Sequence, residues 1–317
     1  MNFTITRQNL HSGLAAVSAS IPSKTTLPVL SNILFEASDD GVWMSGTDLD
    51  VAVRVKVLAD VKESGSLTAP GKKLQEITRE LPDQPVDITT RGDQIELSCG
   101  ASRFKLNGLP ADEFPTLAEV DFSDGITVTG KDLNGLIHHT SFAVSTEESR
   151  PILNGVLWEL RDGEMKMVAT NGHRLARMGV TVDPTGTPSA DFIVPPAALA
   201  QVQRLFKDDD SLQVARSGNH LGFRADTTEI YTRLIAVVAS DQTHRIRLRF
   251  ESGRAHLNVL TPDLGEGHDE MEVGYDGEEL EIGFNANYLL EVLRHIPSDE
   301  VKFAFKAPER AATIEPA

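Results

Sequence analysis

The stretch FNANYLLEVLRHIPSD, residues 284–299, has a layout that determines how the whole chain is organised. It begins with an apolar lead-in and a turn, continues with apolar residues near helical spacing, and stops at an acidic residue. Two earlier stretches have the same layout, TAPGKKLQEITRELPD at 68–83 and IVPPAALAQVQRLFKD at 193–208. A pattern that occurs three times predicts three copies of one structural unit.

Longer stretches of the first two copies repeat at a constant offset of 123 residues. LPVLSNILFEASDDGVWMSGTDLD at 27–50 matches RPILNGVLWELRDGEMKMVATNGH at 150–173, and TRQNLHSGLAAV at 6–17 matches TGKDLNGLIHHT at 129–140. A period above 100 residues is too long for a solenoid and indicates duplicated domains. We therefore expect three domains, at 1–121, 122–235 and 236–317.

Each full copy is predicted to be an α+β domain with two helices packed on antiparallel sheet. VAVRVKVL at 51–58 and VDITT at 86–90 alternate with period two, as half-buried strands do. Helical spacing predicts five helices, at 6–19, 71–81, 130–143, 196–207 and 285–296. Asp-Gly pairs predict hairpin turns at 40–41, 124–125, 162–163 and 276–277.

The third copy is shorter than the other two. The helix that corresponds to the opening stretch occurs once in each copy. Its position in copy two lies 125 residues after its position in copy one, whereas its position in copy three lies only 90 residues after that in copy two. About 35 residues are therefore missing from the third copy. We expect it to lack its first strand and helix, and also a C-terminal strand equivalent to SRFKL at 102–106.

The bulk composition is that of an ordinary globular protein, with 317 residues of which 40% are hydrophobic and 24% charged. No apolar run approaches the roughly 18 residues that span a bilayer, and the start has no signal-peptide pattern. A single cysteine, Cys99, excludes an intrachain disulfide and favours a reducing, cytoplasmic location without membrane contact. The net charge of −17 by itself argues against nucleic acid, because phosphate-binding surfaces are usually basic.

The stretch VATNGHRLARM at 168–178 is the place where a catalytic residue could be sought. Its His173 and Arg174 follow turn-forming residues, but a catalytic histidine needs a nucleophile or a metal with a defined second partner. The sequence shows no metal-ligand cluster, no Gly-x-Ser-x-Gly, no phosphate loop and no dinucleotide fingerprint. We therefore expect no enzyme activity, no cofactor and no metal, with an enzyme that uses His173 and Arg174 as the alternative.

Six motifs together resemble the bacterial sliding clamps, the β subunits of DNA polymerase III. They are LPVLSNILFE, TDLDVAV, LPADEFP, RPILNGVLWE, VATNGHRLA and EIGFNANYLLEVL, in this order over essentially the whole chain. The resemblance implies a head-to-tail homodimeric ring, the DNA clamp fold, with helices lining a hole through which duplex DNA passes. A structural assembly protein that forms a ring without DNA is a further alternative.

The resemblance also implies what such a ring does. It tethers the replicative polymerase to DNA and confers processivity without bond chemistry of its own. The implied partners are a clamp loader, the polymerase α subunit, and other polymerases and repair factors that bind through short linear peptides.

The distribution of charge is compatible with a DNA-encircling ring. The five predicted helices carry a net charge of +4, which leaves −21 for the remainder of the chain. A ring that cannot dissociate needs few phosphate contacts, and an acidic exterior repels DNA from the wrong face. Given the resemblance, the predicted DNA contacts are Arg7, Lys24, Lys72, Lys73, Arg79, Lys131 and Arg204. Solvated helix faces are the alternative explanation for these residues.

Two protein-binding sites are also implied by the resemblance. A partner-peptide pocket with an apolar floor and a polar rim is expected between the second and third domains. Its residues are Arg150, Leu153, Thr170, Gly172, His173, Arg174, Leu175, Asn285 and Tyr288. The dimer interface is expected at Lys73, Arg103, Phe104, Leu106, Val237, Val238, Glu266, Asp269 and Glu270, where Phe104 is alternatively a plain core residue.

Overall fold

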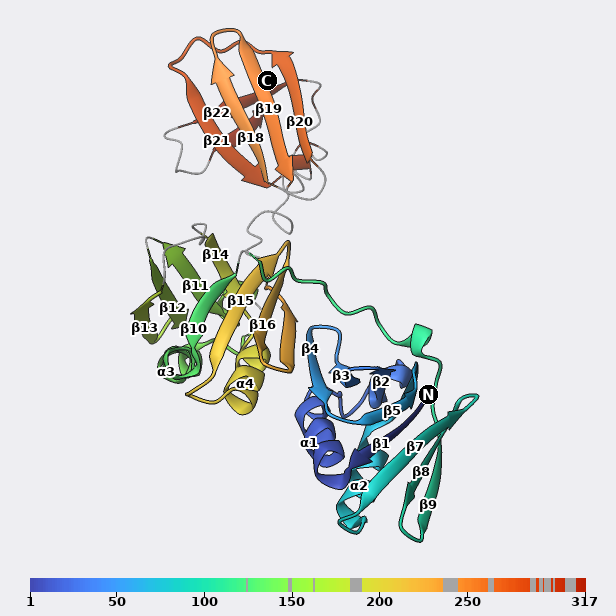
Figure 1. Cartoon of the computed structure of the whole chain (residues 1–317). Helices are drawn as coiled ribbons and strands as arrows, with labels where there is room; N and C mark the ends of the chain where they lie inside the picture. Colours follow the sequence, from blue (N-terminus) through green and yellow to red (C-terminus); the bar gives the residue numbers. More distant parts are fainter. Residues whose placement is uncertain are drawn as a thin grey trace. The chain divides into compact units, whose positions relative to one another are not determined.

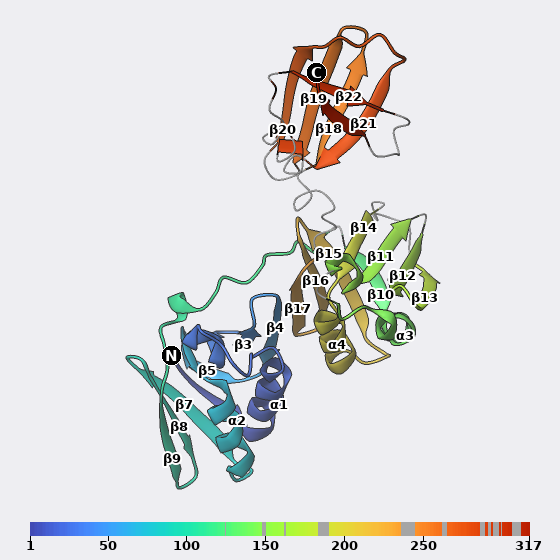
Figure 2. The ribbon, with the colours of Figure 1, turned by 180° about the vertical axis from the view of Figure 1, so that it is seen from behind.

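The structure is a computed structural model whose chain divides into two compact units, Met1–Ala236 and Val237–Ala317 (Figures 1 and 2). Each unit is described by itself. The described residues are 1–123, 125–147, 150–161, 163–182, 190–235, 245–261, 265–285, 289–290, 293, 298, 300–305 and 312–317. For residues 245, 259–261, 265, 266 and 285 only the backbone is described.

Four α-helices in the first unit confirm four of the five predicted helices. They are α1 (Arg7–Ser18), α2 (Gly71–Glu80), α3 (Gly130–Thr140) and α4 (Pro196–Leu205). The first helices of the first two repeats start with the same cap, because the hydroxyls of Thr6 and Thr129 accept the backbone N–H of Asn9 and Asp132, both at 3.1 Å. The predicted helix at 285–296 lies mostly outside the described residues, although Leu289, Leu290 and Leu293 are helical.

Three sheets form the first unit, and one of them passes from the first repeat into the second. The five-stranded sheet has the order β5 (Asp60–Glu63), β1 (Asn2–Thr6), β7 (Pro85–Arg91), β8 (Gln94–Cys99), β9 (Ser102–Asn107). The eight-stranded sheet has the order β10 (Ile126–Thr129), β15 (Ser211–Ser217), β16 (His220–Ala225), β17 (Thr228–Arg233), β4 (Val51–Val57), β3 (Gly41–Thr47), β2 (Asn32–Ser38), β6 (Gly65–Pro70). The four-stranded sheet has the order β13 (Leu175–Thr181), β12 (Glu164–Thr170), β11 (Val156–Arg161), β14 (Ala190–Val194).

The second unit repeats one of these arrangements. Its four-stranded sheet has the order β20 (Gly265–Glu272), β19 (Arg254–Thr261), β18 (Arg245–Glu251), β21 (Leu280–Asn285). This is the order of β13-β12-β11-β14 and of β4-β3-β2-β6, so the three repeats share one sheet topology. A separate hairpin pairs β22 (Val301–Ala304) with β23 (Thr313–Pro316). The chain therefore contains three related α+β clamp domains.

The linker that follows the first repeat packs on the eight-stranded sheet. It contains the short 3-10 helix η2 (Ala111–Glu113), after which Phe114 is buried against Val29 and Leu34. Further along, Phe122 is buried against Ala52 and Tyr231. The neighbours Val51 and Val53 point instead into the main core of the unit, so the linker covers the face opposite to that core.

Two of the predicted hairpin turns are wrong. The pairs at 40–41 and 162–163 do join paired strands, β2 with β3 and β11 with β12. The pair at 124–125 follows the linker, in which residues 111–123 contain no strand, and the pair at 276–277 lies between β20 and β21, which do not pair. An Asp-Gly pair favours a turn but does not determine whether the flanking strands are neighbours.

No helix within the described ranges is long and apolar enough to cross a membrane.

Candidate functional site

The turn between β12 and β13 is held in one shape by its own side chains. The Oδ1 atom of Asn171 accepts the backbone N–H groups of His173 and Arg174, both at 3.0 Å. The hydroxyl of Thr170 donates to the carbonyl of Arg174 at 2.8 Å and accepts the N–H of Gly172 at 3.1 Å. Gly172 has a φ of 88°, where glycine is favoured. This turn exposes the side chains of His173 and Arg174 to solvent.

Large apolar side chains stay exposed at this turn and on the segments that contact it. Leu175, the first residue of β13, is 66% exposed, Phe142 is 56% exposed, and Ile152, two residues after Arg150, is 48% exposed. Arg174 connects Phe142 to the turn, because its guanidinium lies 5.3 Å from the ring centroid and its Nη2 donates to the Phe142 carbonyl at 2.5 Å. Exposed apolar side chains next to a rigid polar turn are typical of a surface that binds a peptide.

Arg150 and Leu153 join the same surface from the segment before β11, which contains the short 3-10 helix η4 (Pro151–Leu153). The Nη1 atom of Arg150 lies 3.3 Å from the position that a Cβ would take at Gly172. Leu153 is half-buried, and its carbonyl accepts the N–H of Ser145 at 2.8 Å. The structure thus brings Arg150 next to the turn at 170–175. Tyr288 lies outside the described residues, and Asn285 is described only by its backbone at the end of β21.

Phe142 and Ile152 are pocket candidates that sequence reasoning missed. Phe142 belongs to the 3-10 helix η3 (Ser141–Ala143), which directly continues α3, so its apolar character looked like part of a helix stripe. Ile152 lies between Pro151 and Leu153, where sequence periodicity does not show which side chains face solvent. The sequence did offer one signal for Phe142, because a large apolar residue just beyond the end of a helix can be exposed and available for binding.

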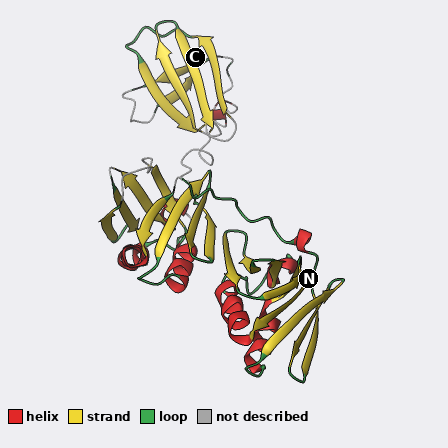
Figure 3. Cartoon of the chain, viewed as in Figure 1, coloured by secondary structure: helices red, strands yellow, loops and turns green. Residues whose placement is uncertain are grey.

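The four α-helices of the first unit form one row in the order α3, α4, α1, α2 (labelled in Figure 1, red in Figure 3). The helices of each repeat pack on each other, and Arg204 of α4 connects the two pairs. Its Nη1 donates to the carbonyl of Ala15 at 3.0 Å and its Nη2 donates to the carbonyl of Ala16, near the end of α1. This row is the surface on which most of the predicted DNA contacts lie.

The predicted DNA contacts have two kinds of environment. Lys72, Lys73, Arg79 and Lys131 are exposed on the helices, and Lys24 is exposed in the loop after α1, beside a shallow hollow of about 500 Å³. By contrast, the guanidinium groups of Arg7 and Arg204 bind carbonyls at helix ends.

Arg7 donates through Nε to the carbonyl of Thr78 at 3.2 Å and through Nη2 to that of Arg79 at 2.9 Å. A guanidinium at a helix C-terminus satisfies orphan carbonyls and complements the dipole of the helix. Desolvation by burial lowers the pKa of Arg204 from its ordinary value. Arg7 and Arg204 therefore have a structural role that the sequence did not indicate.

The predicted dimer-interface strand lies at a sheet edge. β9 ends the five-stranded sheet, with Phe104 and Leu106 half-buried against the main core and Arg103 exposed. In the second unit β20 also ends its sheet, and it exposes the side chains of Asp269 and Glu270.

The remaining predicted interface residues are less informative. Lys73 forms an ion pair with Glu76 of its own helix at 3.1 Å. Only the backbone of Glu266 is described, and Val237 and Val238 lie outside the described residues.

One cluster was not expected from the sequence. The sequence shows no metal-ligand cluster, but the structure brings His256, His268 and Glu270 together on β19 and β20. The three residues lie on two neighbouring strands, and their spacing along the chain matches no common metal motif.

Comparisons with known proteins agree on one family. The models for the N-terminal, central and C-terminal domains of the DNA polymerase III beta subunit match residues 1–118, 127–238 and 224–317. The beta sliding clamp of Pseudomonas aeruginosa is 31% identical over 354 aligned positions, covering 100% of this chain and 96% of the relative. That of Caulobacter vibrioides is 34% identical, covering 97% and 94%.

Solved structures give the same result. A crystal structure of the Pseudomonas aeruginosa sliding clamp bound to griselimycin is 30% identical, with a TM-score of 0.71 and coverage of 100% of this chain and 96% of that chain. The sliding clamp of Bacillus subtilis is 26% identical, with a TM-score of 0.72 and coverage of 99% and 95%. The chain therefore belongs to the DNA polymerase III beta subunit family, the sliding clamps that serve this polymerase as non-catalytic processivity subunits.

Proposed function

We propose that two copies of this sliding clamp close head to tail into a ring around duplex DNA and tether the replicative polymerase there. The observation that carries the proposal is the pairing of β17 with β4, which joins the second repeat to the first within one sheet. Repeating this junction between two copies would continue the sheet from one copy into the next.

The shared topology indicates which strands would meet. β17 is the last strand of the second repeat, and its counterpart in the first repeat is β9. β4 is the end strand of the order β4-β3-β2-β6, and its counterpart in the third repeat is β20. Within the described part of the chain, β9 and β20 each have a strand on one side only. We therefore pair β9 of one copy with β20 of the other, as β17 pairs with β4.

The chemistry of the two edges is complementary. β9 presents the exposed cation Arg103 beside the half-buried side chains of Phe104 and Leu106, whereas β20 exposes Asp269 and Glu270. An unpaired strand edge favours addition of another strand, and opposite charges fix its orientation. Lys73, Val237, Val238 and Glu266 are assigned to this interface on the family resemblance alone.

The helix row is proposed to face the DNA. Lys72, Lys73, Arg79 and Lys131, with Lys24 in its loop, offer exposed ammonium and guanidinium groups to phosphates. Arg7 and Arg204 stay in the proposed DNA-facing set, although each already binds helix carbonyls. Such a surface holds DNA weakly, and the closed ring prevents dissociation.

The turn surface around Leu175 is proposed to bind the short linear peptides of partner proteins. Phe142, Ile152 and Leu175 would receive apolar peptide side chains, while His173 and Arg174 would bind the peptide backbone from the rim. The proposed partners are the polymerase α subunit, a clamp loader, and other polymerases and repair factors. We place this activity in the cytoplasm, where a bacterial chromosome is replicated, and keep 1–121, 122–235 and 236–317 as the proposed domains.

A topological experiment tests the ring. The tag-free chain is loaded on nicked circular plasmid with a clamp loader, and the DNA-bound fraction is separated by gel filtration before and after one restriction cut. Protein on a closed circle should stay bound, and linearisation should release it through the free ends. Equal retention on circular and linear DNA would contradict encirclement.

A further inference from the structure

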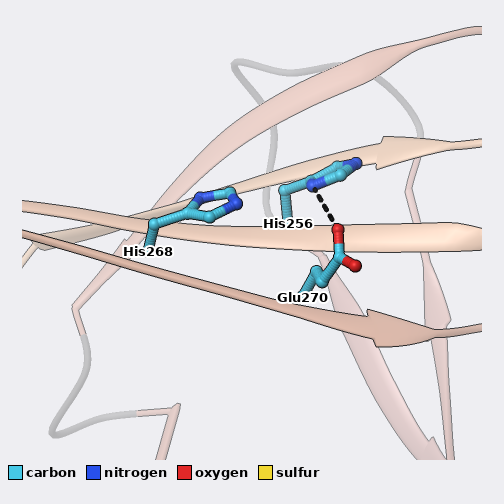
Figure 4. A group of neighbouring side chains, drawn as sticks. All are labelled: His256, His268 and Glu270. Carbon is cyan, nitrogen blue, oxygen red and sulfur yellow. Dashed lines mark ion pairs between the residues drawn. The ribbon is translucent and has the colours of Figure 1, made fainter.

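Three side chains that commonly bind metals meet on one sheet of the second unit (Figure 4). His256 lies on β19, and His268 and Glu270 lie on β20. One candidate ligand atom from each residue lies within 4.8 Å of the other two. In the strand register, His256 is directly opposite Glu270, and His268 is directly opposite Asn258.

The cluster lies on the solvent face of this sheet. Ala255 and Leu257, the residues on either side of His256 in β19, contribute to the core of the unit. Successive side chains of a strand point to opposite faces, so His256 points away from that core. His268 and Glu270 are exposed, and a dissolved ion therefore has direct access to the cluster.

Each histidine already has a partner for one ring nitrogen. The Nε2 atom of His256 lies 3.0 Å from Oε1 of Glu251, and the Nδ1 atom of His268 lies 2.7 Å from Oδ1 of Asn258. In each pair the ring nitrogen donates its hydrogen to the oxygen, because the oxygen can only accept. The other ring nitrogen, Nδ1 of His256 and Nε2 of His268, then has a lone pair that can bind a metal. Histidine ligands of metals usually have such an oxygen partner on the other nitrogen.

The remaining atoms are close to the spacing that a metal requires. Nδ1 of His256 lies 3.8 Å from Oε2 of Glu270. Zinc binds imidazole nitrogen and carboxylate oxygen at about 2.0–2.2 Å, which separates the ligands of a tetrahedral site by roughly 3.3 Å. Small rotations of the exposed side chains of His268 and Glu270 would close the site around an ion.

The surrounding charges do not oppose a cation. Arg254 lies 3.8 Å from Glu270 and directly opposite Glu272 in the strand register, and Arg249, opposite His256 on β18, is paired with Glu279 at 2.7 Å. Glu251 adds a carboxylate behind His256, with its Oε1 atom 3.0 Å from Nε2 of that histidine. The neighbouring carboxylates thus offset both guanidinium groups.

We propose that His256, His268 and Glu270 bind one divalent transition-metal ion of the Zn²⁺ class, with water at the fourth position. Two imidazoles and one carboxylate suit Zn²⁺, Co²⁺, Ni²⁺ or Cu²⁺, whereas Mg²⁺ and Ca²⁺ prefer sites made of oxygen atoms. The ion would cross-link β19 to β20 and stabilise the pairing of these two strands.

Calorimetric titration of the tag-free full chain with ZnCl₂ tests the site. We expect one Zn²⁺ per chain, with affinity at least tenfold weaker in His268→Ala and in Glu270→Gln. Glu270→Gln changes little in shape, so it keeps the test valid if His268→Ala folds poorly. Co²⁺ should give the visible absorption bands of a low-coordinate site in the parent chain, and both variants should lose them.

His11→Ala is the matched control, because His11 is an exposed histidine on α1 of the other unit. It should bind Zn²⁺ as the parent does, and a large excess of Mg²⁺ should not displace the ion. Equal Zn²⁺ affinity in the parent, His268→Ala and Glu270→Gln would overturn the assignment, as would a loss of affinity in His11→Ala.

Discussion

Arg204 is a single side chain that holds two repeats together. It projects from α4 and donates to carbonyls of Ala15 and Ala16, which belong to α1 of the other repeat. Its Nε also donates to Oε1 of Gln201 at 2.9 Å, which orients the guanidinium. The planar fork of arginine can serve several acceptors at once, whereas the ammonium of lysine cannot reproduce this geometry.

Arg204→Ala should lower the free energy of unfolding by about 1–2 kcal/mol, because it leaves carbonyls at the end of α1 without their charged donor. Chemical denaturation followed by circular dichroism measures the change. Lys131→Ala removes an exposed cation on α3 and should leave stability within about 0.5 kcal/mol of the parent. Equal stability in both variants would show that the guanidinium contributes nothing to the junction.

Leu175 is the residue on which the proposed peptide pocket depends. Burying one leucine-sized side chain contributes about 1.5–3 kcal/mol, so two apolar contacts and an ordered peptide give roughly micromolar affinity. Leu175→Asp should abolish binding of a fluorescent peptide with Gln, then Leu, and a terminal Leu-Phe pair. Fluorescence anisotropy measures the affinity.

Two control variants accompany this prediction. Leu58→Asp makes the same change at a leucine that is 77% exposed elsewhere, and Lys24→Ala changes a proposed DNA contact. Both should bind the peptide like the parent. A Leu175→Asp protein that binds equally well means that the pocket lies elsewhere.

At the scale of elements, β9 is held to its sheet by a charged pair as well as by the backbone. Nζ of Lys105 lies 2.7 Å from Oε1 of Glu96 on β8, opposite it in the register. The hydrogen bond from Lys105 holds the pKa of Glu96 below its ordinary value of 4.5. A carboxyl with a lowered pKa stabilises the fold above its unfolded pKa, and this contribution is lost as pH falls through the folded pKa.

Glu96→Gln should therefore lower the midpoint of thermal unfolding near pH 7 and should have no effect well below pH 4.5, where the parent carboxyl is also protonated. Scanning calorimetry over this pH range measures the difference between the two proteins. Lys105→Met removes the other partner of the same pair and should lower the midpoint over the same pH range. A difference that persists in acid would exclude the Lys105 pair as its cause.

The proposed pairing of β9 with β20 also belongs to this scale. Phe104→Arg should convert a two-copy ring into single chains, because it places a charge where two strand edges meet. Light scattering after gel filtration gives the mass, and thermal unfolding checks that the variant is folded. Leu58→Arg introduces the same charge at a highly exposed site and should leave the assembly intact, so dissociation of both variants would contradict the assignment to β9.

At the scale of the whole molecule, a chain with a net charge of −17 has a row of four helices that is net positive, because six Lys and Arg residues there outnumber three Asp and Glu residues. In the proposed ring, a few phosphate contacts would give this surface its affinity for DNA, and encirclement would supply the rest of the retention. This division would allow the ring to slide, since every added contact would slow its movement along DNA.

Binding to a short linear duplex should accordingly be weak at about 0.15 M salt, with a log–log salt slope of roughly −4 or shallower. Equilibrium anisotropy with an open-ended duplex measures both quantities. Nanomolar affinity at that salt concentration would contradict retention by topology. Lys72→Ala combined with Lys131→Ala should weaken the binding further without changing peptide affinity.

Local patterns in the sequence determined much of the fold. The threefold repeat is visible as similar stretches at long, regular offsets. The starts of α1 and α3 at Thr caps and the strands β4 and β7 follow from spacings of two to four residues, which are also visible in the chain itself. The turn at 170–175 was also predictable from two adjacent residues. The side chain of Asn171 accepts a hydrogen bond from the backbone two residues on, and Gly172 adopts the positive φ that the turn requires. Family motifs added the candidate pocket and the candidate interface.

Only the tertiary structure decided which distant segments meet. The pairing of β17 with β4, the carbonyls bound by Arg7 and Arg204, and the exposure of Phe142 and Ile152 all depend on residues far apart in sequence. The two Asp-Gly pairs outside hairpins show the same limit, since a turn signal is local and strand pairing is not. The cluster of His256, His268 and Glu270 is visible only after β19 and β20 pair, because the register sets which side chains face each other.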